Sequence, residues 1–171
     1  MSEQNTLYKL IVLHMLDRID FSLTSSQISD FILGAGYTTW FTLQASLSEL
    51  VESGLVHVET LQNNTFYTIT EEGEKTIGFF RNKISASIRG DIENYLTENK
   101  ISLRQEFSVL ADYQRTNTGE YTATLRIREK TGDLVALTMT VPDENQAKNI
   151  CNNWRNKNQE VYEYLVRNLM I

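Results

Sequence analysis

The segment Leu43–Lys75 constrains the fold of this chain more strongly than any other part of it. Apolar residues recur at spacings of three and four as far as Val51, and Gly54 then supplies the residue type that commonly ends a helix. Residues 55–61 and 66–69 have strand character and flank a polar turn, which predicts a hairpin. A threonine and two glutamates then predict the first turn of another helix.

The residues before this segment predict two further helices. An apolar face over residues 4–18 predicts the first, and Thr24 or Ser25 is placed to cap the second, which ends at a pair of glycines. One of two threonines then caps a third helix over residues 40–53. Together with the hairpin, this order predicts a winged helix-turn-helix domain over residues 1–75, with the third helix in the recognition position.

The second half of the chain has a different pattern. Residues 76–100 keep helical spacing and predict a connector of either one long helix or two shorter ones. Residues 101–171 then show three alternating stretches, the first over Phe107–Tyr113, and a helix that opens after Pro142. We therefore predict an α+β fold, in which a connecting helix joins the winged helix-turn-helix to a three-stranded antiparallel sheet packed by a long helix.

The charge of the chain is unfavourable for binding a polyanion. Its formal net charge is −6 at pH 7, and residues 1–70 contain Lys9 and Arg18 against seven acidic residues. Lys and Arg supply most of the sequence-independent affinity for nucleic acid. The expected reading domain is therefore acidic, and it should bind phosphates weakly by itself.

The patterns of several other protein classes are missing. The apolar runs are too short to cross a bilayer and no signal peptide is recognisable, so we predict a cytoplasmic protein that contacts no membrane. A single cysteine, Cys151, excludes an intrachain disulfide. His14 and His57 have no Asp, Glu or Cys at ligand spacing. We therefore expect no metal, no organic cofactor and no enzymatic activity.

The outward side of the predicted third helix is where a winged helix would read DNA. It carries hydroxyl, amide and methyl groups, which suit phosphates, base edges and thymine methyl groups. The polar tip of the hairpin suits a minor groove, although it has no Lys or Arg. The candidate DNA-binding residues are Thr38, Thr39, Thr42, Gln44 and Ala45 on the helix and Gln62, Asn63 and Asn64 at the tip.

Protein contacts are the alternative use of these surfaces. Phe41 and Glu49 also lie on the outward side of the third helix, and an exposed aromatic side chain is a typical anchor for a partner. Arg126 and Arg128 are two residues apart on a predicted strand, so both should project from one face and form a mildly cationic surface. These four residues are the candidate partner-binding residues.

Across its full length the sequence resembles an uncharacterised bacterial family known only as a domain of unknown function. The resemblance rests on the order of several short motifs, among them YTTWFTLQASLSELVESGLV, YTITEEGEKTIGFF and VPDENQAKNICNNW. That family is described as winged-helix-like and regulatory, without an assigned activity. The resemblance therefore implies a DNA-binding fold.

Residues 1–80 are also similar to winged-helix transcriptional repressors, at LSELVESGLV and FYTITEEGEK. The Arg and Lys residues with which those repressors contact DNA have no counterpart on the third helix or the hairpin tip. We predict a transcriptional regulator that binds double-stranded DNA as a homodimer, because two copies place two third helices about one DNA turn apart. The alternative is a winged-helix module that binds proteins and not DNA.

Overall fold

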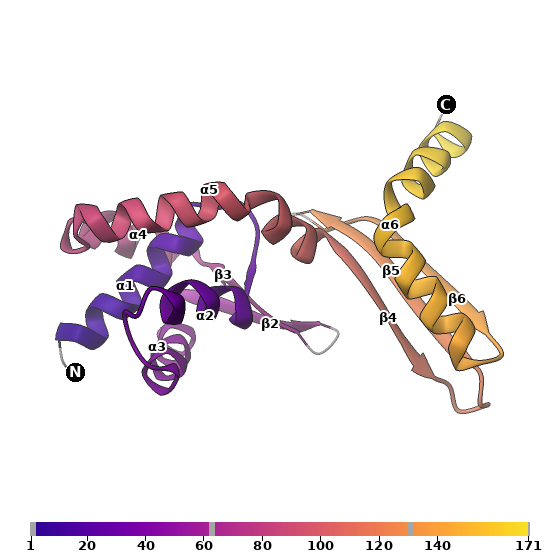
Figure 1. Ribbon diagram of the computed structural model, residues 1–171, viewed down its shortest axis with the longest axis horizontal. Coiled ribbons are helices and arrows are strands. Elements are labelled where there is room, and N and C mark those ends of the chain that lie inside the picture. The colour runs from indigo at the N-terminus through magenta and orange to yellow at the C-terminus, as the bar shows by residue number, and fades with distance from the viewer. Residues whose placement is uncertain (1–2, 62–63, 130–131, 171) are drawn as a thin grey trace. The chain divides into compact units, whose positions relative to one another are not determined.

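The structure is a computed structural model that describes residues 3–61, 64–129 and 132–170. Over these residues the chain forms six α-helices and two three-stranded antiparallel sheets (Figure 1). It divides into two compact units, residues 1–103 and 104–171, and each contains one of the sheets. The α+β fold class predicted from the sequence is confirmed.

The N-terminal unit has the element order expected for residues 1–75. Its small sheet has the strand order β1-β3-β2, and both pairings are antiparallel. The elements are α1 (Glu3–Asp17), β1 (Leu23–Thr24), α2 (Ser25–Gly34), α3 (Trp40–Glu52), β2 (Val56–Leu61), β3 (Asn64–Ile69) and α4 (Glu71–Phe80).

Local capping explains where these helices begin. Thr24 caps α2 in a capping box with Gln27, in which each side chain bonds the backbone N–H of the other residue. Thr39 caps α3 by accepting a hydrogen bond from the backbone N–H of Thr42. Of the two residues that the sequence offered for each cap, the structure therefore uses Thr24 for α2 and Thr39 for α3.

The core of the N-terminal unit gathers the residues whose spacing predicted it. Leu43, Leu47, Leu50 and Phe66 are all buried, whereas Leu55 is only half-buried. Each fully buried side chain of this size stabilises the fold by roughly 1.5–3 kcal/mol relative to an exposed one. Their burial fixes one side of α3 against the unit and leaves the other side facing solvent.

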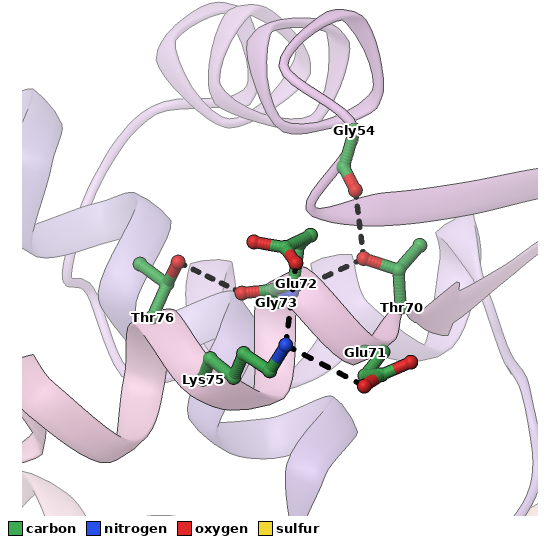
Figure 2. Close-up of polar contacts among 7 residues, drawn as sticks. All are labelled: Gly54, Thr70, Glu71, Glu72, Gly73, Lys75 and Thr76. Carbon is green, nitrogen blue, oxygen red and sulfur yellow. Dashed lines mark hydrogen bonds and ion pairs between the residues drawn. The ribbon is translucent and has the colours of Figure 1, made fainter.

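A close approach between α4 and the chain that enters β2 completes this unit (Figure 2). The Thr70 hydroxyl donates to the Gly54 carbonyl at 2.7 Å and accepts from the Gly73 N–H at 3.1 Å, so it caps α4 and ties its start to the end of α3. A Cβ on Gly73 would lie 2.1 Å from the Leu55 carbonyl oxygen. Only glycine fits this position without a backbone shift.

The connector consists of two helices, one of the two forms expected for it. After α4, a 3₁₀ turn, η1 (Arg81–Lys83), leads into α5 (Ala86–Ser108). The prediction that Phe107 begins a strand is wrong, because it lies in the last turn of α5. Leu103 and Phe107 are both buried and stand four residues apart, so the apolar spacing of the helix continues to its end.

The C-terminal unit is an antiparallel sheet of order β4-β5-β6 with a long helix across one face. Cys151 and Trp154 of the helix pack on Ala123, Leu125 and Ile127 of the central strand. Leu169, the last residue of the helix, is 76% exposed. The elements are β4 (Val109–Arg115), β5 (Tyr121–Glu129), β6 (Gly132–Val141) and α6 (Glu144–Leu169).

Candidate nucleic-acid interface

The solvent-facing side of α3 carries two large aromatic side chains at its start. Trp40 is 53% exposed and Phe41 is 79% exposed, and their rings meet edge to face with centroids 5.2 Å apart. Ala45, one turn further along, is also exposed. Trp40 and Phe41 therefore form an exposed aromatic pair at the start of α3.

The threonines predicted to contact DNA lie at the same end of the helix. Thr39 is exposed, and its hydroxyl donates to the Thr42 hydroxyl at 3.1 Å as well as capping the helix. Thr38, Thr42 and Gln44 are half-buried, so they border the exposed face and do not form its centre. The five candidate residues of the helix therefore form one continuous region around the N-terminus of α3.

Charge is unevenly distributed along α3. Its first turn contains no acidic residue, whereas Glu49 and Glu52 lie in the C-terminal half. Glu49, a candidate partner-binding residue, forms an ion pair with Lys9 of α1. The partial positive charge of the helix dipole at the N-terminus is therefore not offset by acids of the first turn. This end of α3 is more favourable to an anion than the net charge of the domain suggests.

Both basic residues within residues 1–70 are engaged in ion pairs. Lys9 pairs with Glu49, and Arg18 pairs with Glu93 of α5. On α4, Lys75 is exposed but lies 3.5 Å from carboxylate oxygens of both Glu71 and Glu72 (Figure 2). Among the described residues, the cation cluster that most phosphate-binding surfaces use is therefore not found on α3 or beside it.

The hairpin tip is described only in part. Asn64, the first residue of β3, is exposed and pairs across the hairpin with Leu61. Gln62 and Asn63, the other two candidate residues of the tip, lie outside the described residues.

The expected cationic face on β5 does not form. Arg126 is paired with Asp133 of β6, with 3.1 Å between Nη2 and Oδ1. Arg128 is 7% exposed; its Nε donates to the Phe107 carbonyl at 2.8 Å, and its guanidinium stacks 4.3 Å from the Phe107 ring centroid. A register shift between Ile127 and Arg128 interrupts the strict alternation on which the prediction relied.

The two histidines and the single cysteine lie in different surroundings. His57 is exposed on β2, and Cys151 of α6 is buried against the sheet, where burial raises the pKa of its thiol. His14 is buried, yet it lines a cavity of about 390 Å³ together with Arg18, Arg81, Arg89 and Glu93. No sequence motif could reveal this cavity, because its residues come from α1, η1 and α5.

Two structural features are absent from the described part of the chain. Within the ranges 3–61, 64–129 and 132–170, no group of three or more His, Cys, Asp or Glu residues is placed to hold a metal ion. None of the helices in that part of the chain has the length and apolar content that crossing a bilayer requires.

Comparison with known proteins gives a matching family and, among solved structures, a partial match. No curated protein matches the sequence. The crystal structure of Sso10a-2, a DNA-binding protein from Sulfolobus solfataricus, is 24% identical over 54% of this chain and 90% of that one, with a TM-score of 0.32. At that TM-score the likeness carries no conclusion about function. The family described as "Domain of unknown function (DUF4364)" matches residues 8–169, and the chain belongs to this family.

Proposed function

We propose that this chain is a winged-helix transcriptional regulator, without enzymatic activity, that binds double-stranded DNA in the cytoplasm as a homodimer. The observation that carries the proposal is the N-terminal half of α3. It faces solvent, is capped by Thr39 and carries no acidic side chain in its first turn. In helix-turn-helix proteins the N-terminal residues of the recognition helix are the ones that reach base edges in the major groove.

The chemistry of this region suits a groove. The hydroxyls of Thr39 and Thr42 can bond phosphate oxygens or base edges, and Gln44 can pair with adenine through two hydrogen bonds. Ala45 is exposed one turn away, where its methyl group can contact a thymine methyl. The acids that oppose binding are in the other half of the helix, and Lys9 pairs with one of them.

A dimer would compensate for the shortage of cations. Two copies double the number of favourable contacts, and their spacing selects a DNA site of matching symmetry. The C-terminal end of α6 supplies apolar surface that a second copy could cover, because Tyr164, Leu169 and Met170 are exposed there. Because one copy has few cations near α3, we expect modest affinity for non-specific DNA and a shallow salt dependence.

A duplex-binding titration tests this proposal. A fluorescent mixed-sequence duplex is titrated with the full chain at several salt concentrations, and the anisotropy gives the dissociation constant at each. We expect binding at low salt that weakens linearly on a double-logarithmic plot as salt rises. If the duplex is not bound even at the lowest salt, the proposal is wrong for non-specific DNA, and selection from a random duplex library then decides whether any sequence binds.

Protein binding is the second candidate, and the Trp40–Phe41 pair specifically favours it. Aromatic anchors dominate the energetics of protein interfaces, and truncating one commonly costs about 2 kcal/mol or more. Under this alternative the chain does not bind duplex DNA in the titration. Phe41→Ala then disrupts a protein assembly that the unaltered chain forms.

A further inference from the structure

The cavity at the C-terminal end of α1 is the feature that the proposed function leaves unused. It has a volume of about 390 Å³, and all of its lining residues belong to the N-terminal unit. That volume lies within the range of small-molecule sites in proteins. The polar residues around it are His14 from α1, Arg18 just after that helix, Arg81 from η1, and Arg89 and Glu93 from α5.

Several buried polar atoms at this cavity lack a partner among the described residues. Both ring nitrogens of His14 are unpartnered, and so is the Nε of each of Arg81 and Arg89. His14 is only 3% exposed, so bulk water does not readily replace the missing hydrogen bonds. A buried donor without a partner costs roughly 1–3 kcal/mol, and a cluster of several in a fold therefore calls for an explanation.

The cavity also has an excess of positive charge. Arg18 is paired with Glu93, and Arg81 is paired with Asp17. Arg89 has no ion pair with any described residue, and it lies in the first turn of the 23-residue helix α5, where the helix dipole adds a partial positive charge. The lining residues together with Asp17, which pairs with Arg81, therefore sum to one uncompensated positive charge, that of Arg89.

We propose that this cavity is a binding site for the oxyanion group of a small metabolite, either a carboxylate or a phosphate. Guanidinium groups match the geometry of both oxyanions. A metal cation does not suit this cavity, because three guanidinium groups and only one carboxylate line it. Arg89, whose charge no described residue pairs, is the group that the ligand would neutralise.

The charges around the His14 imidazole provide a way to detect an anion in the cavity. Burial, and then the charge of Arg81, lower the pKa of its imidazole, while Glu93 and Asp17 act in the opposite direction. An anion beside the ring would offset the first two effects and raise that pKa. Ligand binding should therefore be visible at His14 itself, and the chain contains one other histidine, His57, as an internal reference.

Inorganic phosphate and acetate are the probes for a first experiment. Each is titrated into the full chain at constant ionic strength with chloride as the balancing anion, and the imidazole resonances of His14 and His57 are followed by NMR. We expect a saturable shift at His14 with His57 unmoved, and the probe that binds more tightly identifies the class of oxyanion. No saturable shift at His14 with either probe would overturn the proposal.

Two variants and one control show whether the response comes from this cavity. Arg89→Gln removes the uncompensated cation, and we expect it to weaken binding about tenfold or more. Gly90→Leu is an independent block, because Gly90 lines the cavity and a Cβ there meets no atom within 4 Å, so the variant should fold and fill the space.

The control is Lys100→Gln, which makes the same charge change at an exposed position of α5 outside the cavity. It should bind phosphate or acetate like the unaltered chain. Phosphate binding that survives both cavity variants, or that Lys100→Gln weakens equally, would mean that the anion binds elsewhere and would overturn the proposal. Because no duplex is present in any arm, the outcome is separate from that of the DNA-binding proposal.

Discussion

Lys9 on α1 forms an ion pair with Glu49 on α3, two positions separated by forty residues in the sequence. The pair holds a cation beside the acidic half of α3, so the two charges largely cancel for an approaching phosphate. The net negative charge of residues 1–70 predicts an obstacle to DNA binding. Beside α3 the negative charge is smaller than that net value suggests.

A double-mutant cycle tests the effect of this pair on DNA. Lys9→Gln should weaken duplex binding at low salt several-fold, because it leaves the Glu49 carboxylate uncompensated. Adding Glu49→Gln should restore most of the affinity, while the stability of each variant changes by less than about 1 kcal/mol. Equal duplex affinity for all four proteins would show that the C-terminal half of α3, which carries Glu49, lies away from DNA.

The two glycines of α4 should respond to alanine in opposite directions. Gly73→Ala should destabilise the protein by about 1–3 kcal/mol, because its Cβ would meet the Leu55 carbonyl oxygen at 2.1 Å and neither backbone can yield easily. Gly78→Ala, in the same helix with nothing within 4 Å, should stabilise it by about 0.5–1 kcal/mol. Urea unfolding of both variants measures the difference. Similar effects at both positions would contradict the close approach of α4 to the start of β2.

His14 should make the protein less stable in mild acid. Its pKa in the folded state is lowered, mainly by burial, so below its unfolded value of about 6.5 the unfolded chain binds more protons than the folded one. Stability is therefore fully present above that pH and falls as the pH drops towards the folded pKa. His14→Phe should flatten this fall, as measured by urea unfolding between neutral pH and mild acid. A variant with an unchanged pH slope would argue against a neutral, buried imidazole.

Phe41→Ala separates the two proposed functions. The side chain is 79% exposed, so its truncation should change stability by less than about 0.5 kcal/mol. If α3 reads DNA and the dimer forms elsewhere, the variant should keep the sedimentation behaviour of the unaltered chain. Loss of the assembly in Phe41→Ala would instead favour the protein-binding alternative.

Local signals in the sequence predicted the elements of this fold well. Thr24, Thr39 and Thr70 each cap a helix through a hydrogen bond to a backbone N–H three residues later, which depends only on neighbouring residues. The same local reasoning failed at Phe107, because its spacing to Val109 fits a strand and its spacing to Leu103 fits a helix. Packing of Phe107 against Arg128, a contact between distant residues, accompanies the helical outcome.

The surroundings of the candidate site residues depend more heavily on contacts between residues that are distant in the sequence. The three candidate threonines lie together at the start of α3 because they are close in the sequence, Thr39 as the cap and Thr42 in the first turn. The sequence could not show that Glu49 is paired with Lys9, nor that Arg128 is buried against Phe107. The cavity at His14 was also hidden, because its charged residues become neighbours only when α1, η1 and α5 pack together.

The most direct test of the central claim, that the N-terminal half of α3 reads DNA, compares Thr42→Glu with Thr42→Gln. Thr42 is the third residue of α3 after the Thr39 cap, and either replacement there can complete a capping box, so both variants should fold at least as well as the original. The two replacements have nearly the same shape and differ in charge.

Duplex titration at low salt should therefore separate them. We expect Thr42→Gln to bind within about threefold of the unaltered chain and Thr42→Glu to lose about tenfold or more, because its carboxylate would face DNA phosphates with little screening. The gap between the two variants should narrow as salt is raised. Equal duplex affinity for the two variants would contradict the claim that this end of α3 contacts DNA.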